Sequence, residues 1–344
     1  MIIDVHGHLS APAELYAWKS GLLSHRGAHG RGAPRISDDQ LRAAHTEPHP
    51  SFGNVSHLDH IDGAGVDVQL ISPRPYQMMH SEQGKLVQWF TEETNDLIHR
   101  STQLFPGRFL GVAGLPQSPE LEPARWVGEL RRTVTELGFV GALLNPDPFE
   151  GTATPPALGD RYWYPLYEAL CELDVPALIH AAGCRPPARE PYSLHFIQEE
   201  TVAIWSLLNS SVLQDFPELR IVVSHGGGAI PYQVGRFLPS GVRSGATPYL
   251  DKLRRLYFDT CLYTRDAIEL LIRTVGVDRC LFGTEKPGTG SQINPDNGRW
   301  FDDIHLLVDE IDWLTDADRT ALFEGNARAV FPIGADAGAP ARTA

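Results

Sequence analysis

Eight short apolar segments, separated by helical patterns, constrain the fold of this chain more than any other feature. Several are continuous runs of Val, Ile, Leu and Phe, as expected for parallel strands that are buried on both faces. The expected strands are 2–5, 67–72, 109–114, 139–144, 175–179, 220–224, 256–259 and 279–283, with helical patterns between them at, for example, 85–103, 122–137, 164–172 and 264–275. Eight strand–helix units predict a single α/β domain, a (β/α)8 barrel of the TIM type.

The 344 residues exceed what a barrel of this kind needs, which is about 250 residues. Residues 11–57 are rich in Gly, Pro, His and Arg, with helix-like patches at 13–23 and 38–44. We therefore predict a long insertion after the first strand, placed at the barrel mouth as a lid or subunit contact; a flexible surface excursion is the alternative. The barrel domain is expected over residues 1–333, and residues 334–344 are expected to form a disordered tail.

The net charge of −14 argues against non-specific binding to nucleic acid or to anionic membranes. The sequence has no apolar run of membrane-spanning length and no signal-peptide pattern. None of the four cysteines is part of a CxxC pair, so buried free thiols are expected. Together these features predict a cytoplasmic protein that acts on small molecules.

Polar side chains follow the predicted strands where each strand ends. His6 and His8 follow the first strand at positions i and i+2, which places both imidazoles on one face and provides half of a divalent-metal site. Other strands end in Ser72-Pro73-Arg74, Asn145-Pro146-Asp147, His180, His225-Gly226-Gly227-Gly228 and Thr284-Glu285-Lys286. Because the carboxyl ends of barrel strands form the catalytic face, these groups are expected to converge on one site.

The arrangement of His-x-His after strand one, His after strands five and six, and an acid after strand eight resembles the amidohydrolase superfamily. The resemblance extends from residue 1 to about residue 331 and is greatest for the aminocarboxymuconate-semialdehyde decarboxylase-like branch. It rests on Ile179-His180, Ser224-His225-Gly226-Gly227-Gly228, Phe282-Gly283-Thr284-Glu285 and Gly325-Asn326-Ala327.

One residue departs from that branch, because the acid after strand eight is usually aspartate and here is Glu285. In this respect the chain is similar to the 4-oxalomesaconate hydratase family. The similarity includes the opening 3–8, Ser72-Pro73-Arg74, Met78-Met79-His80, 283–288 and Gly290-Ser291. It implies addition of water to the conjugated double bond of an unsaturated oxo-polycarboxylic acid in aromatic-acid breakdown.

We expect His6, His8 and His180 to be metal ligands, with Glu285 either a fourth ligand or the group that holds a water. Zinc is favoured by the imidazole-rich set and by the resemblance, although these ligand types also permit manganese or iron. His225 is assigned to proton transfer, since an imidazole pKa near 6.5 suits neutral pH. A purely structural bond to the glycine turn is the alternative for His225.

The implied substrate is a tricarboxylate, so a chain of this charge needs cations at the site. Arg74 is the best candidate because it directly follows strand two, and arginine can hold a carboxylate with two hydrogen bonds. Further candidate cations are Arg236, Lys286, Arg185 and Arg189, and candidate neutral contacts are Asn145, Tyr192, His195 and Ser291.

Three other functions fit parts of the pattern. A metal-dependent decarboxylase of an aromatic or muconate-type acid would use the same scaffold, and Glu285 weighs against it without excluding it. A hydrolase of lactones or amides would be expected to carry aspartate after strand eight. A non-catalytic binding protein would not need intact metal ligands. The resemblance also implies a homodimer or a larger homo-oligomer.

Overall fold

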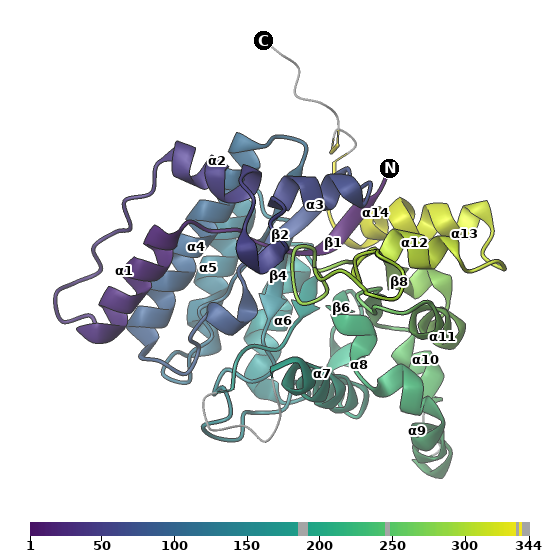
Figure 1. The fold of residues 1–344 in the computed structure, drawn as a ribbon. Helices are drawn as coiled ribbons and strands as arrows, with labels where there is room; N and C mark the ends of the chain where they lie inside the picture. Colours follow the sequence, from purple (N-terminus) through teal and green to yellow (C-terminus); the bar gives the residue numbers. More distant parts are fainter. Residues whose placement is uncertain (185–191, 245–247, 335–336, 339–344) are drawn as a thin grey trace.

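The computed structural model describes residues 1–184, 192–244, 248–334 and 337–338, and its centre is a barrel of eight parallel strands (Figure 1). The strands pair in chain order, as β1 (Ile3–His8), β2 (Val68–Ser72), β3 (Phe109–Ala113), β4 (Gly141–Leu144), β5 (Ala177–Ile179), β6 (Ile221–Val223), β7 (Tyr257–Asp259) and β8 (Cys280–Leu281). Two backbone bonds join β1 to the segment after β8: Val5 N–H donates to the Phe282 oxygen at 2.9 Å, and Glu285 N–H donates to the His6 oxygen at 2.7 Å. The predicted α/β barrel is confirmed.

Helices follow the strands and form an outer layer around the barrel (Figure 1). They are α1 (Ala13–Ser24), α2 (Asp38–Thr46), α3 (His57–Gly63), α4 (Gly84–Leu104), α5 (Pro123–Thr135), α6 (Tyr164–Glu172), α7 (Tyr192–Leu208), α8 (Val212–Asp215), α9 (Ile230–Ser244), α10 (Tyr249–Leu253), α11 (Arg265–Val275), α12 (Ile304–Asp309), α13 (Asp316–Thr320) and α14 (Asn326–Val330). Among the described residues, no helix combines the length and the apolar character needed to cross a membrane.

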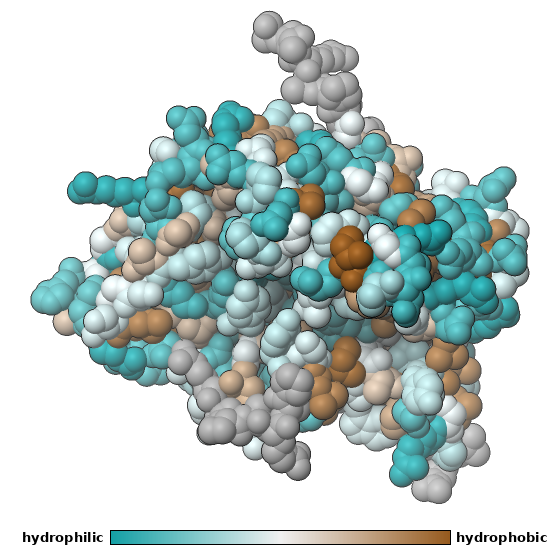
Figure 2. All heavy atoms as spheres, in the orientation of Figure 1, coloured by the Kyte–Doolittle hydropathy of each residue, from teal (hydrophilic) through white to brown (hydrophobic). Residues whose placement is uncertain are grey.

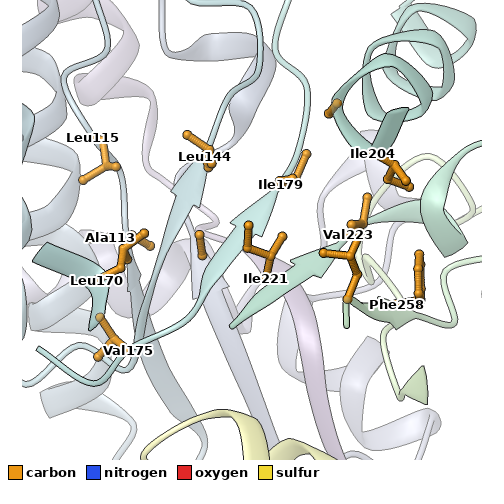
Figure 3. Packing of buried hydrophobic residues seen from close by; sticks show 14 of the residues in the cluster. Ala113, Leu115, Leu144, Leu170, Val175, Ile179, Ile204, Ile221, Val223 and Phe258 are labelled. Carbon is orange, nitrogen blue, oxygen red and sulfur yellow. The ribbon is translucent and has the colours of Figure 1, made fainter. Parts of the chain in front are cut away.

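Two hydrophobic cores explain why the sequences of the strands are continuous apolar runs. Alternate residues such as Leu178 and Val222 point into the barrel, where they meet Phe331 beside α14. The intervening residues, among them Ile179, Ile221 and Val223, pack outward against the helices (Figure 3). Since both faces of each strand are covered, apolar residues at consecutive positions are buried.

The segment after β1 forms α1 and α2, which lie to one side of the barrel in Figure 1. α2 begins with a capping box, in which the Ser37 hydroxyl accepts from Gln40 N–H and the Gln40 side chain accepts from Ser37 N–H. The end of the segment, a 3₁₀ turn at Pro50–Phe52, reaches the mouth of the barrel. The expected disordered tail, residues 334–344, lies mostly outside the described residues.

Candidate active site

Three histidines at the carboxyl end of the barrel point toward one another. His6 and His8 belong to β1, which extends three residues further than the sequence indicated, and His180 directly follows β5. Their ring centroids are 5.1 to 5.3 Å apart. Each Nδ1 is held by a partner: His6 by Asp259 Oδ2 at 2.7 Å, His8 by Ser72 Oγ at 2.9 Å and His180 by the Ala181 oxygen at 2.7 Å.

The Nε2 atoms of the same three rings are buried and have no hydrogen-bond partner within the described part of the chain. A buried polar atom without a partner costs free energy, so three at one point indicate a ligand-binding site. These atoms and a carboxylate oxygen of Glu285 all lie within 4.8 Å of one another. Three imidazoles and one carboxylate fit a divalent transition metal such as zinc or manganese.

Burial keeps two of these imidazoles neutral, which is the state that binds a metal. It lowers the pKa of His8 to about 4 and the pKa of His180 well below its ordinary value. The pKa of His6 is also lowered by burial, but the carboxylates of Asp259 and Glu285 together more than reverse this effect. A carboxylate on the far nitrogen of a ligand histidine orients the ring and increases its basicity.

Glu285 completes the cluster from the turn after β8. Its φ of 60° lies in the left-handed region, a strained conformation for a residue other than glycine. Tyr263 donates to Oε2 at 2.9 Å, and Oε1 lies 3.8 Å from His8 Nε2. Burial raises the pKa of Glu285, but His225 and His8 together hold it well below its usual range, so the group is a carboxylate.

His225 faces the same point from the turn after β6. The Glu200 carboxylate holds His225 Nδ1 at 2.9 and 3.0 Å, which leaves Nε2 directed at Glu285 Oε2, 3.8 Å away. Burial lowers the pKa of His225, yet the two glutamates raise it well above its ordinary value. The turn has positive φ at His225, and a Cβ added at Gly228 would lie 2.6 Å from the Ile197 oxygen of α7. Glycine at this position therefore lets the turn pass close to α7.

A cavity of about 360 Å³ opens above the cluster. Its walls are His8, Ser51, Phe52, Arg74, Pro75, Tyr76, His180, Tyr192, Phe196, Glu285, Gly288 and Thr289. The Arg74 guanidinium lies over the Phe52 ring at 5.1 Å and donates to the Pro287 oxygen at 3.1 Å. At the rim, the hydroxyls of Tyr192 and Thr289 are 3.1 Å apart. Arg74 and Tyr192 are thus substrate-contact candidates that the structure brings to the cavity.

Other candidates from the sequence are not among the residues that line this cavity. Lys286 is buried and pairs with Asp302, at 3.2 Å, and with Asp303, and the Ser291 hydroxyl also bonds Asp302. Asn145 uses its side chain within its own turn, donating to the Asp147 oxygen at 2.9 Å. His195 is buried on α7 and Arg236 is exposed on α9, and neither is among the cavity walls. Arg185 and Arg189 fall outside the described residues.

Sequence reasoning missed three residues that support the cluster. Asp259 ends β7, so the strand-end rule that found the histidines should also have found it. Glu200 projects from the middle of α7, and no local pattern distinguishes it from other helix carboxylates. Tyr263 follows β7 by four residues and reaches Glu285 only because the chain turns back.

Comparison with known proteins agrees with this geometry. The family model described as amidohydrolase matches residues 3–333. The 2-keto-4-carboxy-3-hexenedioate hydratase of Sphingobium sp. (strain NBRC 103272 / SYK-6) is 39% identical over 96% of both chains. The solved structure of 4-oxalomesaconate hydratase from Rhodopseudomonas palustris has a TM-score of 0.85 and 35% identity, again over 96% of both chains.

Decarboxylases are more distant relatives. The γ-resorcylate decarboxylase of Polaromonas sp. (strain JS666 / ATCC BAA-500) is 31% identical over 70% of this chain and 75% of its own. A dihydroxybenzoic acid decarboxylase from Polaromonas sp. JS666, solved with manganese bound, is 24% identical, with a TM-score of 0.68 over 96% of both chains. With the family model covering nearly its whole length and a relative of 39% identity, this chain belongs to the amidohydrolase family.

Proposed function

We propose that this protein is a metal-dependent hydratase, a hydro-lyase that adds water to the conjugated carbon–carbon double bond of an unsaturated oxo-polycarboxylic acid. The observation that carries the proposal is Glu285, a glutamate where the related decarboxylases are expected to carry aspartate, set beside three metal-binding imidazoles. The two hydratase relatives, each matched over 96% of both chains, support it. Their names describe keto or oxo acids with several carboxylates.

The residues around the cluster divide the chemistry between two proton-carrying groups. His6, His8 and His180 would hold a divalent ion, which would supply a Lewis acid that lowers the pKa of water and stabilises negative charge on an oxygen. Glu285, a carboxylate, accepts a proton as the water oxygen bonds to the distal alkene carbon. The π electrons move to the keto oxygen and then return to form a C–H bond with a proton delivered by His225 Nε2. Glu200 holds the other nitrogen of His225 during this transfer.

Zinc is the metal we favour, because three of the four donors are imidazole nitrogens. The glutamate oxygen also accepts manganese, which binds oxygen donors readily. Metal analysis of the purified protein, followed by removal with a chelator and reloading with each ion, distinguishes the two. We expect activity to be lost on removal and recovered best with zinc.

Substrate recognition is assigned to the cavity rim. Arg74 provides the charge for one substrate carboxylate, while Tyr192 adds a hydroxyl. The end of the insertion, at Ser51 and Phe52, covers this side of the cavity and would act as a lid. Arg185 and Arg189, the other arginines considered for the remaining substrate carboxylates, lie outside the described residues.

A homodimer or a larger homo-oligomer is proposed from the outer face of α7. Leu194, Val202 and Trp205 are exposed there and lie three or eight residues apart, on one side of the helix. Figure 2 shows hydrophobic side chains at the lower edge of the molecule near α7. The four free cysteines also suit a reducing compartment, so we propose a cytoplasmic enzyme.

Product analysis tests the proposed reaction. The zinc-loaded protein is incubated with 4-oxalomesaconate while loss of the conjugated chromophore and release of carbon dioxide are followed together. Chromophore loss without carbon dioxide is expected, and incorporation of oxygen from ¹⁸O-labelled water into the product would identify the added group. Release of carbon dioxide in proportion to turnover would instead assign the protein to the decarboxylases.

A Glu285→Gln variant tests the residue that carries the proposal. The substitution keeps the size of the side chain but removes the base, and loss of a positioned base costs about 10² to 10⁴ in rate. The variant should still bind the metal through its three histidines. Full turnover by Glu285→Gln would remove Glu285 from the chemistry and the proposed function with it.

A further inference from the structure

The glycine between the two β1 histidines makes room for a side chain of the neighbouring strand. A Cβ added at Gly7 would lie 2.3 Å from Cδ of Gln69, closer than any side chain could tolerate without a shift. Gln69 belongs to β2, is completely buried, and pairs with Asp4 in the β1–β2 register. The residue between the two histidines, Gly7, is therefore small because the Gln69 side chain occupies the space beside it.

The Gln69 amide joins two of the segments that carry the candidate metal ligands. Its Nε2 donates to Asp4 Oδ2 at 2.8 Å, on β1, and to the Lys286 oxygen at 2.7 Å, in the turn after β8. Lys286 is the residue next to Glu285. One buried amide thus contacts both the strand of His6 and His8 and the backbone that follows Glu285.

Asp4 extends the same junction. Its Oδ1 accepts from His6 N–H and from Thr284 N–H, both at 3.0 Å, and its Oδ2 accepts from the Thr284 hydroxyl at 2.6 Å. Thr284 precedes Glu285 as Lys286 follows it, so both neighbours of the strained glutamate are tied to the Asp4–Gln69 pair. These bonds hold φ of Glu285 at 60°, which an isolated turn would relax.

The orientation of the Gln69 amide is set by His57, the last residue of the insertion. Gln69 Oε1 accepts from His57 Nε2 at 2.7 Å, so the His57 proton is on Nε2 and its Nδ1 is an acceptor. That Nδ1 faces Ser10 Oγ at 2.9 Å and His45 Nδ1 at 3.1 Å, which places a proton on His45 Nδ1. Every polar atom of the Gln69 side chain therefore has a defined partner. A rotated amide would turn its single acceptor, Oε1, toward the acceptor oxygens of Asp4 and Lys286, and its NH2 group toward the His57 donor.

We propose that Gln69 is a positioning residue of the active site, which fixes Glu285 relative to His6 and His8 by bridging Asp4 and the Lys286 carbonyl. The inference rests on the proposed role of Glu285. It goes beyond that role because Gln69 is not among the residues that line the cavity, and its side-chain hydrogen bonds go to Asp4, Lys286 and His57. Its removal should loosen the geometry of the cluster while leaving the substrate-contact residues in place.

The test uses Gln69→Met, which keeps the length of the side chain and removes its hydrogen bonds. We expect kcat to fall and the dissociation constant for the metal, measured by chelator competition, to rise by about 10- to 100-fold, the usual effect of losing an outer partner of a metal site. KM should change little. The visible absorption of the cobalt-loaded variant should also shift, since it reports the geometry of the ligands. Gln69→Glu, which keeps the acceptor for His57 but loses both donors, should show the same pattern.

Asn95→Leu is the matched control. Asn95 is also a buried amide, on α4, and it donates to the Gly114 oxygen at 3.0 Å and to Glu129 at 2.7 Å, away from the cluster. Both variants should lose stability, but only the Gln69 variants should change kcat, metal affinity and the cobalt spectrum. The proposal is overturned if Gln69→Met and Gln69→Glu match Asn95→Leu in all three measurements. If Glu285→Gln, assayed alongside, loses turnover in that case, the proposed function stands without the positioning role.

Discussion

Two groups of buried histidines lie in this molecule, and they differ in how their ring nitrogens are used. At the barrel mouth, His6, His8 and His180 each have a partner on Nδ1 and none on Nε2 among the residues described. Within the insertion, His45 and His57 have partners on both nitrogens. Three buried ring nitrogens that lack a partner and converge on one point indicate a ligand site, whereas histidines bonded on both nitrogens hold elements together.

The largest effect on metal binding and turnover is expected from His180→Asn, which removes a single candidate ligand atom, Nε2, from the first group. An asparagine amide can keep the bond that His180 Nδ1 makes to the Ala181 oxygen, while Nε2 is lost. The metal dissociation constant should rise beyond the roughly 100-fold that loss of an outer partner can cost, and turnover should disappear. Chelator competition and metal analysis provide the measurement. Wild-type metal affinity in this variant would mean that His180 is not a ligand.

His225→Asn separates proton transfer from metal binding in the same region. Asparagine can retain the contact with Glu200 but has no group in place of Nε2. Turnover should fall by about 10² to 10⁴, the range for loss of a general acid or base, at full metal content. Metal loss in parallel with activity would reassign His225 to the ligand set.

A smaller change is expected from Arg74→Gln at the cavity rim. Loss of a hydrogen bond to a charged group costs about 1.5 to 3 kcal/mol, so KM should rise by about 10- to 100-fold with less change in kcat. Arg161→Gln is the control, because Arg161 also lies over an aromatic ring, Tyr164 at 5.7 Å, but is not among the cavity walls. Equal KM values for Arg74→Gln and the wild type would rule out the carboxylate contact.

The smallest effect on activity is expected from His45→Leu in the second group. Ser101 loses a partner and His57 loses a donor, so unfolding free energy should drop by about 1 to 3 kcal/mol, the cost of a buried polar group left without a partner. Ser10 can still donate to His57, which keeps the orientation of Gln69. Denaturant titration and metal analysis should show lower stability at full metal content. A loss of metal would contradict the distinction between the two groups.

Much of the fold, and the grouping of His6, His8, His180 and Glu285, could be predicted from the sequence because both depend on short-range patterns. The sequence of a barrel strand shows an apolar run, and the residues at its carboxyl end and in the turn that follows lie at the catalytic face. His6, His8, His180, His225 and Glu285 all follow this rule.

The direction in which every side chain after a strand points could not be predicted in this way. Lys286 follows Glu285 directly, yet its side chain pairs with Asp302 and Asp303, 16 and 17 residues further along the chain. His45 and His57 look like metal ligands by residue type, and only the three-dimensional contacts show that their nitrogens are already bonded. Partners distant in sequence decide such cases, and local patterns do not contain them.

Anomalous scattering at the zinc edge, measured on crystals of the zinc-loaded protein, tests the central distinction most directly. We predict one strong peak about 2.0 to 2.1 Å from the Nε2 atoms of His6, His8 and His180, the usual zinc–imidazole distance, and none between His45 and His57. A peak at the His45–His57 pair would contradict the account. So would crystals of catalytically active protein that show no peak at the barrel mouth.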